Sequence, residues 1–131
     1  MFLDSSGLLC LHHADEPGHH DARVVFDAAG PKVVHSYVLA ELVALALARG
    51  VDRRETLGFL DGLLAQPDVR VVWVDRNLHD RAMDLLRGRL DKTYSLCDAV
   101  SFLVMQARGT IEALTTDHHF EQAGFVRLLR P

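Results

Sequence analysis

The sequence of 131 residues lacks the features that mark several large classes of protein. No apolar run reaches about 18 residues, so we expect no membrane span. The N-terminus has no basic leader before an apolar run, so we expect no secretory signal. Only two cysteines are present, Cys10 and Cys97. Their scarcity and separation indicate a reducing, cytoplasmic location and two small core thiols rather than a disulfide.

The chain also lacks an excess of positive charge and the common phosphate-binding and nucleophile motifs. Its net charge of −4 gives no overall attraction for nucleic acid, so such binding needs a local patch or a second subunit. There is no Gly-rich phosphate loop, Walker lysine or nucleophile elbow. Repeats, linkers and low-complexity tracts are absent, and 49% of the residues are hydrophobic. We therefore expect residues 1–131 to form a single domain with a real core.

Short apolar runs alternate with helical segments along the chain. The expected strands are 1–3, 32–35, 69–74, 113–115 and 125–129. The expected helices are 8–13, 22–29, 36–50, 53–66, 76–87 and 95–107, with a further helical turn after Asp117. Alternation of this kind predicts an α/β fold in which helices cover both faces of a mainly parallel sheet.

One of these helices is apolar on almost every side. Between Tyr37 and Ala48 the only residue that is not apolar is Glu41. A helix apolar all round is normally buried, and a buried carboxylate without a partner costs roughly several kcal/mol. With Ser36 as the cap, Glu41 lies beyond the first turn, so helix capping does not explain it. Glu41 is therefore neutral, paired with a cation, or next to a metal ion.

Three further acids belong to the same edge of the predicted sheet. Asp4 ends the first strand, and Asp117 follows the strand 113–115. The helix that contains Glu41 directly follows a strand, and Asp98 lies in the first turn of a helix that precedes one. Because parallel strands end at a common edge, we expect the four carboxylates to converge there. Without a metal they should repel, and we expect the pKa of Glu41 to rise most.

Each acid also has a purely structural interpretation. Asp4 and Asp117 are suited to cap the helices that follow them. Asp98 fits a capping box with Ser95, because S-x-x-D places the acid at the third helical position. The carboxyl edge of the sheet would lack a chemical role only if all of these structural interpretations were true at the same time.

Clustered carboxylates attract a hard divalent cation. Mg²⁺ or Mn²⁺ takes oxygen ligands in octahedral geometry and keeps several waters. Such an ion can activate a water and can neutralise charge on a phosphate during in-line displacement. Two ions perform these two tasks at the same time. Hydrolysis of a phosphodiester bond is the reaction that these residues fit best.

Four motifs resemble those of PIN-domain ribonucleases of the VapC toxin type. They are FLDSS at the N-terminus, YVLAE around Glu41, SLCDA around Asp98, and LTTDHHFEQAGF near the C-terminus. The resemblance extends over nearly the whole chain. It implies a three-layer α/β/α fold with a five-stranded parallel sheet and a metal-dependent endoribonuclease that cleaves RNA. It also implies a homodimer and a cognate antitoxin that holds the enzyme inactive.

The resemblance further assigns roles to six residues. The acids that would bind Mg²⁺ or Mn²⁺ and carry out catalysis are Asp4, Glu41, Asp98 and Asp117. Ser6 and Thr115 match the hydroxyl positions that support the first and last acids. Some family members carry a further acid shortly after the position of Asp117, whereas here His118 and His119 follow.

Several other residues have simpler interpretations. Four histidines match no tight structural zinc pattern: His12, His13, His19 and His20. His118 and His119 follow the proposed site directly; we expect them at the surface, and the alternative is a contact with phosphate. We expect Trp73 and Phe102 in the core. A basic cluster consists of Arg76, Arg81, Arg87, Arg89 and Lys92. It is either a solvated helix face or a contact for the RNA backbone.

Two other functions stay open at this point. The chain could be a catalytically silent PIN-like module that binds RNA or a protein partner, and a Mn²⁺ titration would separate this from an enzyme. It could also be a phosphatase-type domain that uses Asp4 as a nucleophile. Haloacid-type phosphatases, however, have a second acid where Ser6 is found here.

Overall fold

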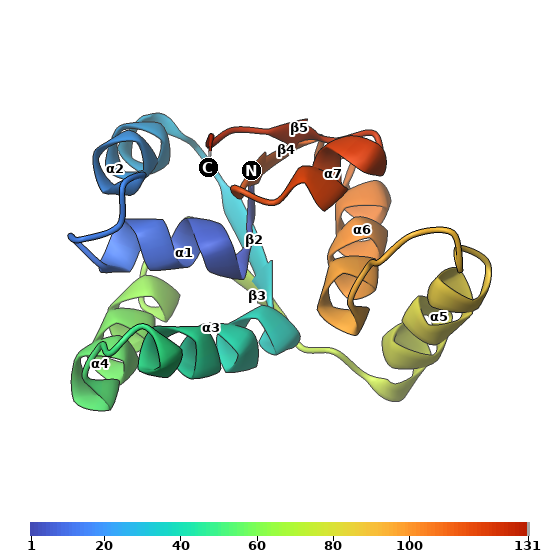
Figure 1. Cartoon of the computed structure of the whole chain (residues 1–131), viewed down its shortest axis with the longest axis horizontal. Coiled ribbons are helices and arrows are strands. Elements are labelled where there is room, and N and C mark those ends of the chain that lie inside the picture. The colour runs from blue at the N-terminus through green and yellow to red at the C-terminus, as the bar shows by residue number, and fades with distance from the viewer. Residues whose placement is uncertain (131) are drawn as a thin grey trace.

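Five parallel strands form one sheet in the computed structural model, which describes residues 1–130 (Figure 1). The strands are β1 (Phe2–Leu3), β2 (Lys32–His35), β3 (Val69–Val72), β4 (Glu112–Leu114) and β5 (Val126–Arg127). Their order is β3-β2-β1-β4-β5, and every neighbouring pair is parallel. The predicted parallel sheet is therefore confirmed.

Helices cover both faces of this sheet. They are α1 (Ser5–His12), α2 (His19–Ala28), α3 (Ser36–Ala48), α4 (Arg53–Leu64), α5 (Arg76–Arg87), α6 (Leu96–Arg108) and α7 (His118–Gln122). Figure 1 shows α1 to α4 on one side of the sheet and α5 to α7 on the other, which is the predicted three-layer α/β/α arrangement. Within residues 1–130, no helix has the length and apolar character needed to cross a membrane.

The central strand, β1, is the most deeply buried part of the sheet. Because β1 pairs with β2 and β4 on its two sides, Phe2 and Leu3 are fully buried. Asp4 follows directly, so β1 brings this acid to the carboxyl edge of the sheet. Cys10 and Cys97 are buried free thiols, as predicted.

Two helices begin earlier than the sequence predicts. α1 begins at Ser5 rather than Leu8, because the Leu8 amide donates to the Asp4 carbonyl (2.9 Å) and closes a helical turn there. α2 begins at His19 rather than Ala22, directly after the Pro17-Gly18 turn. β2 and α5 have the predicted bounds.

Glycine is required at position 7 because α1 lies directly against β4. A Cβ atom on Gly7 would lie 1.9 Å from the backbone carbonyl oxygen of Leu114, far inside van der Waals contact. This close approach of two backbones fixes Ser5 and Ser6 beside the carboxyl end of the sheet.

Only one face of α3 is buried, so the expectation of a helix buried on all sides is wrong. The buried residues of α3 are Val38, Leu42 and Ala46. Exposed apolar residues on its outer face include Ala40, Ala44 and Leu47, of which Leu47 is 52% exposed. Ser36 does not cap α3, since its hydroxyl accepts a hydrogen bond from the Val74 amide (2.9 Å). The cap is His35, because α3 follows β2 without a loop.

His35 is a fully buried, neutral histidine at the end of β2. Its Nδ1 accepts from the Val38 amide (3.3 Å), and its Nε2 lies 2.8 Å from Ser101 Oγ in α6. The Ser101 hydroxyl donates its proton to the Cys97 carbonyl (2.8 Å), so Nε2 carries the histidine proton. Burial lowers the pKa of His35 to about 4.

We expect His35 to make the fold sensitive to acid. Its pKa is about 4 in the folded protein and 6.5 for a histidine free in water, so the unfolded chain binds more protons between these values. Stability conferred by the neutral ring is present above pH 6.5 and is lost as the pH falls towards 4, by about 3 kcal/mol. Denaturant unfolding of the wild type and His35→Gln over this pH range measures the effect. The contributions of the other titrating groups cancel in the difference between the two free energies of unfolding. A difference that does not change with pH would contradict it.

Candidate active site

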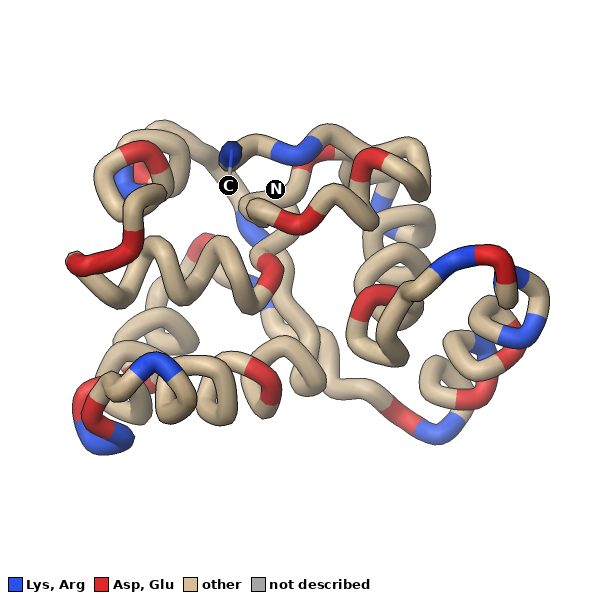
Figure 2. Tube along the Cα trace, viewed as in Figure 1, with Lys and Arg blue, Asp and Glu red and all other residues tan. Residues whose placement is uncertain are grey.

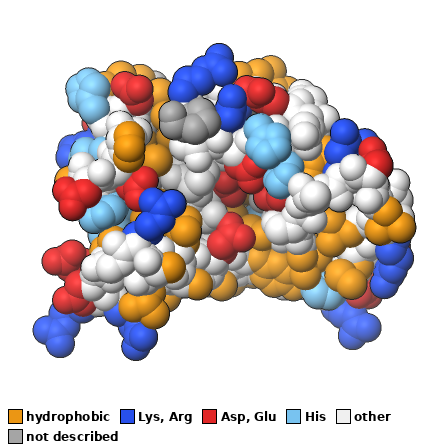
Figure 3. Space-filling model, in the orientation of Figure 1, with side chains coloured by type: hydrophobic (Ala, Val, Ile, Leu, Met, Phe, Trp, Pro, Cys, Tyr) orange, Lys and Arg blue, Asp and Glu red, His pale blue; other side chains and the backbone are white. Residues whose placement is uncertain are grey.

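The four predicted acids lie at the carboxyl edge of the sheet. Asp4 follows β1, Asp117 follows β4, Glu41 lies in the second turn of α3, and Asp98 lies in the first turn of α6. Figure 2 shows acidic positions at the start of α1, in α3, at the start of α6 and before α7, around the middle of one face. Figure 3 shows acidic side chains in the middle of the same face, with histidines beside them. The structure thus brings together segments that are far apart in sequence.

Asp4 is held by two hydroxyl groups rather than acting as a helix cap. Its side chain makes no capping bond to α1. Thr115 Oγ1 donates to Asp4 Oδ2 (2.7 Å), and Ser6 Oγ lies 3.1 Å from the same oxygen. The hydroxyls are themselves held by backbone amides, Ser6 by that of Thr116 and Thr115 by that of Asp117 (both 3.0 Å). Both hydroxyls therefore contact Asp4, whereas Thr115 reaches Asp117 only through that amide.

The pKa of Asp4 is raised to about 7, chiefly because the carboxyl group is buried. The charges of Asp98 and Glu41 raise it further, while the hydrogen bond from Thr115 opposes the rise. Burial also raises the pKa of Asp98, and the charge of Asp117 adds to this rise. The expectation that the pKa of Glu41 rises most is wrong, because it is the pKa of Asp4, a carboxyl group only 3% exposed, that rises to about 7.

Glu41 is tied to α1 by a residue that sequence reasoning missed. The Ser5 hydroxyl donates to Glu41 Oε1 and so connects α3 to α1. Next to it lies the Cys97 thiol, whose pKa is raised by burial and then by the charges of Glu41, Asp4 and Asp98. The proximity of three carboxylates to one thiol shows how crowded this edge is. Ser5 was detectable only as the neighbour of Asp4 in the FLDSS motif.

Asp98 and Asp117 both have the structural roles proposed for them. Ser95 Oγ accepts from the Asp98 amide (2.9 Å), and Asp98 Oδ2 accepts from the Ser95 amide (3.0 Å), which completes a capping box. Asp117 Oδ1 accepts from the His119 amide (2.9 Å) and caps α7. Each carboxylate uses one oxygen for these bonds, so capping does not exhaust either acid as a ligand.

The two adjacent histidines differ in their surroundings. His118 is at the surface, with 64% of its side chain exposed, as expected. His119 is not, since only 15% of its side chain is exposed and its Nδ1 lies 3.3 Å from Asp98 Oδ2 and 3.3 Å from Asp117 Oδ1. Within residues 1–130, a group of three possible ligands within 4.8 Å of one another consists of Asp117, His118 and His119.

Comparison with known proteins agrees with this geometry. The family model for the PIN domain matches residues 1–126. The chain belongs to the PIN-domain family. It is 31% identical over 129 residues to the 23S rRNA-specific endonuclease VapC20 of Mycobacterium tuberculosis, covering 98% of this chain and 97% of that protein. It is 28% identical over 143 residues to the ribonuclease VapC31 of the same organism, covering 100% of this chain and 98% of that one.

A solved structure has the same fold. The crystal structure of M. tuberculosis VapC20, described as a toxin that cleaves the sarcin-ricin loop, matches with a TM-score of 0.88 and 30% identity. The match covers 99% of this chain and 98% of that one. The chain is therefore a ribonuclease of the VapC toxin type. Nucleases of the PIN family generally need a divalent metal, and VapC toxins act on RNA and pair with antitoxins.

The arginines of this PIN domain that were candidates for RNA contact are largely paired with acids. On the exposed surface of α5 and the loop after it, Arg76 pairs with Asp80, Arg87 with Asp84, and Arg89 with Asp91. An RNA contact by this cluster stays a prediction. Trp73 is 68% exposed, so its assignment to the core is wrong, whereas Phe102 is buried as predicted. The strand ends at Val72, one residue before Trp73.

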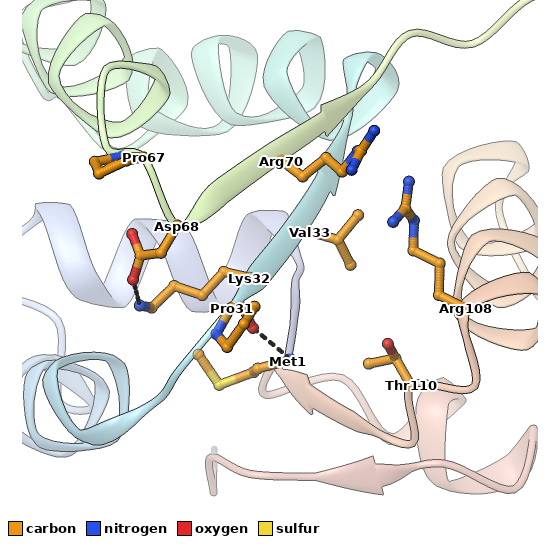
Figure 4. Close-up of a pocket in the computed structure, with 9 residues that line it drawn as sticks. All are labelled: Met1, Pro31, Lys32, Val33, Pro67, Asp68, Arg70, Arg108 and Thr110. Atoms are coloured by element: carbon orange, nitrogen blue, oxygen red, sulfur yellow. Dashed lines mark hydrogen bonds and ion pairs between the residues drawn. The ribbon is translucent and has the colours of Figure 1, made fainter.

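A cavity of about 400 Å³ lies at the opposite, amino edge of the sheet (Figure 4). Its charged lining includes Lys32, Asp68, Arg70 and Arg108. Lys32 Nζ pairs with Asp68 (2.8 Å), and the Arg70 and Arg108 side chains point towards one another. None of the four predicted acids lines this cavity. The candidate active site is therefore the acidic carboxyl edge.

Proposed function

We propose that this ribonuclease cleaves RNA with Mg²⁺ or Mn²⁺ held by Asp4, Glu41, Asp98 and Asp117. The observation that supports this most strongly is Asp4, a buried carboxyl group whose pKa is raised to about 7 by burial and by neighbouring carboxylates. Such a group is costly to ionise unless a cation neutralises it. The donor set is all oxygen, which fits a hard divalent ion.

The residues around the acids act as positioning groups. Thr115 and Ser6 fix one oxygen of Asp4, and Ser5 fixes one oxygen of Glu41. When bound, the divalent ion supplies the counter-charge and Lewis acidity that phosphodiester hydrolysis by water requires. The burial of Asp4 removes competing water and strengthens its interaction with a cation.

The substrate class that we propose is ribosomal RNA. VapC20 is named as specific for 23S rRNA, and this chain covers nearly all of it. Primer extension on treated ribosomes would map the cut, and cleavage confined to messenger or transfer RNA would contradict the proposal. We also propose cytoplasmic action under the control of a cognate antitoxin. If co-expression of a small protein encoded immediately upstream left toxicity unchanged, that part of the proposal would be wrong.

We propose a homodimer as the assembled form. The exposed apolar residues of α3, namely Ala40, Ala44 and Leu47, follow helical spacing and form a stripe. Burial of such a stripe against a second copy would remove apolar surface from water. Light scattering that reports only a monomer at micromolar concentration would contradict this assembly.

Cleavage should depend on a divalent metal and on Glu41. We expect the wild type to cut RNA in Mg²⁺, to stop when EDTA is added, and to recover with excess Mg²⁺. Glu41→Gln, purified in the same way, should cut about 100-fold more slowly, because it keeps the side-chain shape but loses the charge. Gel analysis of a labelled RNA measures both effects, and the variant also controls for contaminating nuclease. Unchanged cleavage in EDTA, or no Mn²⁺ binding by calorimetry, would favour a different function.

A further inference from the structure

A cavity of about 440 Å³ begins beside the four acids and extends along α1. Ser6 and Thr116 line its first end. Both residues belong to the acidic edge, because Ser6 Oγ lies 3.1 Å from Asp4 Oδ2 and accepts a hydrogen bond from the Thr116 amide (3.0 Å). Glu16 and Arg49 line the other end, beyond the last turn of α1. We call this cavity the α1 groove.

The α1 groove carries an arginine whose charge is largely free. Arg130 Nη1 lies 3.9 Å from Glu121 Oε1, whereas Arg127 Nε lies only 3.0 Å from the same oxygen. The chain before Arg130 is fixed, because Leu129 is buried and its amide donates to the Thr115 carbonyl (3.2 Å). Since 83% of the Arg130 side chain is exposed, its guanidinium group is available to bind a phosphate.

The far end of the α1 groove holds an acid and an arginine that orient one another. Arg49 Nη1 donates to Glu16 Oε1 (2.6 Å), and only 13% of the Glu16 side chain is exposed. Within residues 1–130, no group donates to the other carboxylate oxygen, Oε2, and this oxygen is open to solvent. Oε2 is therefore free to accept an N–H group of a ligand. The planar guanidinium group of Arg49 also offers a face on which a nucleobase can stack.

The size and walls of the α1 groove suit a single nucleotide. Leu9 and Leu45 supply apolar wall between its two polar ends. Its volume lies within the range of about 300 to 1,000 Å³ that is typical of small-ligand sites, so it does not admit a duplex. Proteins that read RNA sequence commonly stack unpaired bases and bond their edges in this way. Because the groove begins at Ser6, its occupant would be next to the bond that is cut.

We propose that the α1 groove binds the nucleotide next to the cleaved bond of a single-stranded RNA segment. Arg130 contacts the phosphate of this nucleotide. The base lies against Leu45 and Arg49, and Glu16 Oε2 accepts an N–H group from the edge of the base. This inference rests on the proposed ribonuclease function and adds to it a site that selects where the RNA is cut.

Arg130→Gln tests the phosphate contact. With a short labelled single-stranded RNA, the slope of log kcat/KM against log salt concentration should become less negative by about 0.7, the value for one phosphate contact on a single strand. Arg108→Gln is the matched control, because Arg108 is an exposed arginine at the opposite, amino edge of the sheet. Its slope should equal that of the wild type. A purely structural role of Arg130 would lower activity without changing the slope.

Glu16→Gln tests the base contact, because it replaces the free acceptor by an amide that can also donate. Sequencing the fragments of a randomised RNA should show a changed nucleotide preference at one position beside the cut. Glu55→Gln on the exposed surface of α4 should keep the wild-type preference.

Leu45→Trp tests the groove itself by filling it. This variant should raise KM for RNA about 10-fold with little change in kcat, because it removes binding that the ground state and the transition state share. Leu57→Trp is the control, since Leu57 is 47% exposed on α4 and lies outside the groove.

An unchanged salt slope in Arg130→Gln, or an unchanged cut-site preference in folded Glu16→Gln, would overturn the inference. So would groove variants that cleave RNA like the wild type but bind the antitoxin more weakly, because the groove would then be a protein-docking surface. Calorimetry should show wild-type Mn²⁺ affinity in every groove variant, since none of them changes a proposed metal ligand. If the groove variants behave like the wild type while RNA cleavage still requires a divalent metal, the proposed function stands and only the nucleotide site is wrong.

Discussion

Asp4→Asn is expected to be more stable than the wild type in metal-free buffer at pH 8, by about 4 kcal/mol, although it removes the central acid of the site. The reason is that burial raises the pKa of Asp4 from 3.8 to about 7, so the ionised group at pH 8 destabilises the fold. Asparagine has nearly the same shape, still accepts the hydrogen bond from Thr115, and carries no charge.

The gain should depend on pH in a defined direction. The pKa of Asp4 is higher in the folded protein than the ordinary value of 3.8, so the folded state binds more protons between pH 3.8 and 7. The wild type therefore gains stability relative to Asp4→Asn as the pH falls from 7, and the difference vanishes below about 4. The opposite effect of His35 is present in both proteins and cancels.

Denaturant unfolding with EDTA, repeated with Mg²⁺, measures both parts of this prediction. Mg²⁺ should stabilise the wild type, because binding to the folded state adds to its stability, and should leave Asp4→Asn almost unchanged. Asp61→Asn on the exposed surface of α4 is the control, and its stability should follow the wild type at every pH. If Asp4→Asn is less stable than the wild type at pH 8 without metal, the described electrostatic crowding of Asp4 is wrong.

The sequence predicts the fold where local pattern and packing agree. β2 and α5 have their predicted bounds, because a β-branched run follows Gly30-Pro31 and an amphipathic segment follows the capping Asp75. The start of α1 was missed because Ser5-Ser6-Gly7 is also a good turn sequence. Its helical state depends on the close approach of Gly7 to Leu114, which lies more than a hundred residues away in the chain.

Tertiary contacts also explain the errors at Trp73 and α3. The alternating run 69–74 predicts a strand through Val74, yet the Val74 amide bonds to the Ser36 hydroxyl and the strand ends at Val72. Trp73 is thereby left exposed. The apolar outer face of α3 looks like a buried helix in sequence, and its exposure becomes visible only when its neighbours are placed.

For the site, the sequence predicts the position of the acids but not their individual environments. The rule that parallel strands end at one edge is sufficient to place Asp4, Glu41, Asp98 and Asp117 together. Whether they bind metal stays a prediction. The placement of His119 beside Asp98 and Asp117 could not be predicted, because its other ring nitrogen contacts Thr93, which is distant in sequence. The sequence also could not show which of the four acids has the most raised pKa, since the burial of Asp4 depends on the packing of α1 against β4.

Asp98→Asn is expected to lower RNA cleavage by about 1,000-fold without lowering the melting temperature. Helix capping alone would be enough to explain Asp98, because its carboxylate and the Ser95 hydroxyl form a full capping box. An asparagine oxygen still accepts the Ser95 N–H, so the cap persists while the negative charge is lost. A large loss of activity would therefore be due to the charge rather than to the helix.

The matched control is Asp75→Asn, which changes another helix-capping acid. Asp75 Oδ1 accepts from the Leu78 amide (2.8 Å) at the start of α5, and Asp75 is not one of the four acids. The most direct test of the central claim is the rate of Mg²⁺-dependent cleavage of a labelled RNA by the wild type, Asp98→Asn and Asp75→Asn, with melting curves for each. We expect Asp75→Asn to cleave like the wild type and Asp98→Asn to be nearly inactive while folded. Wild-type cleavage by folded Asp98→Asn would show that Asp98 is only a cap and would contradict a four-acid metal site.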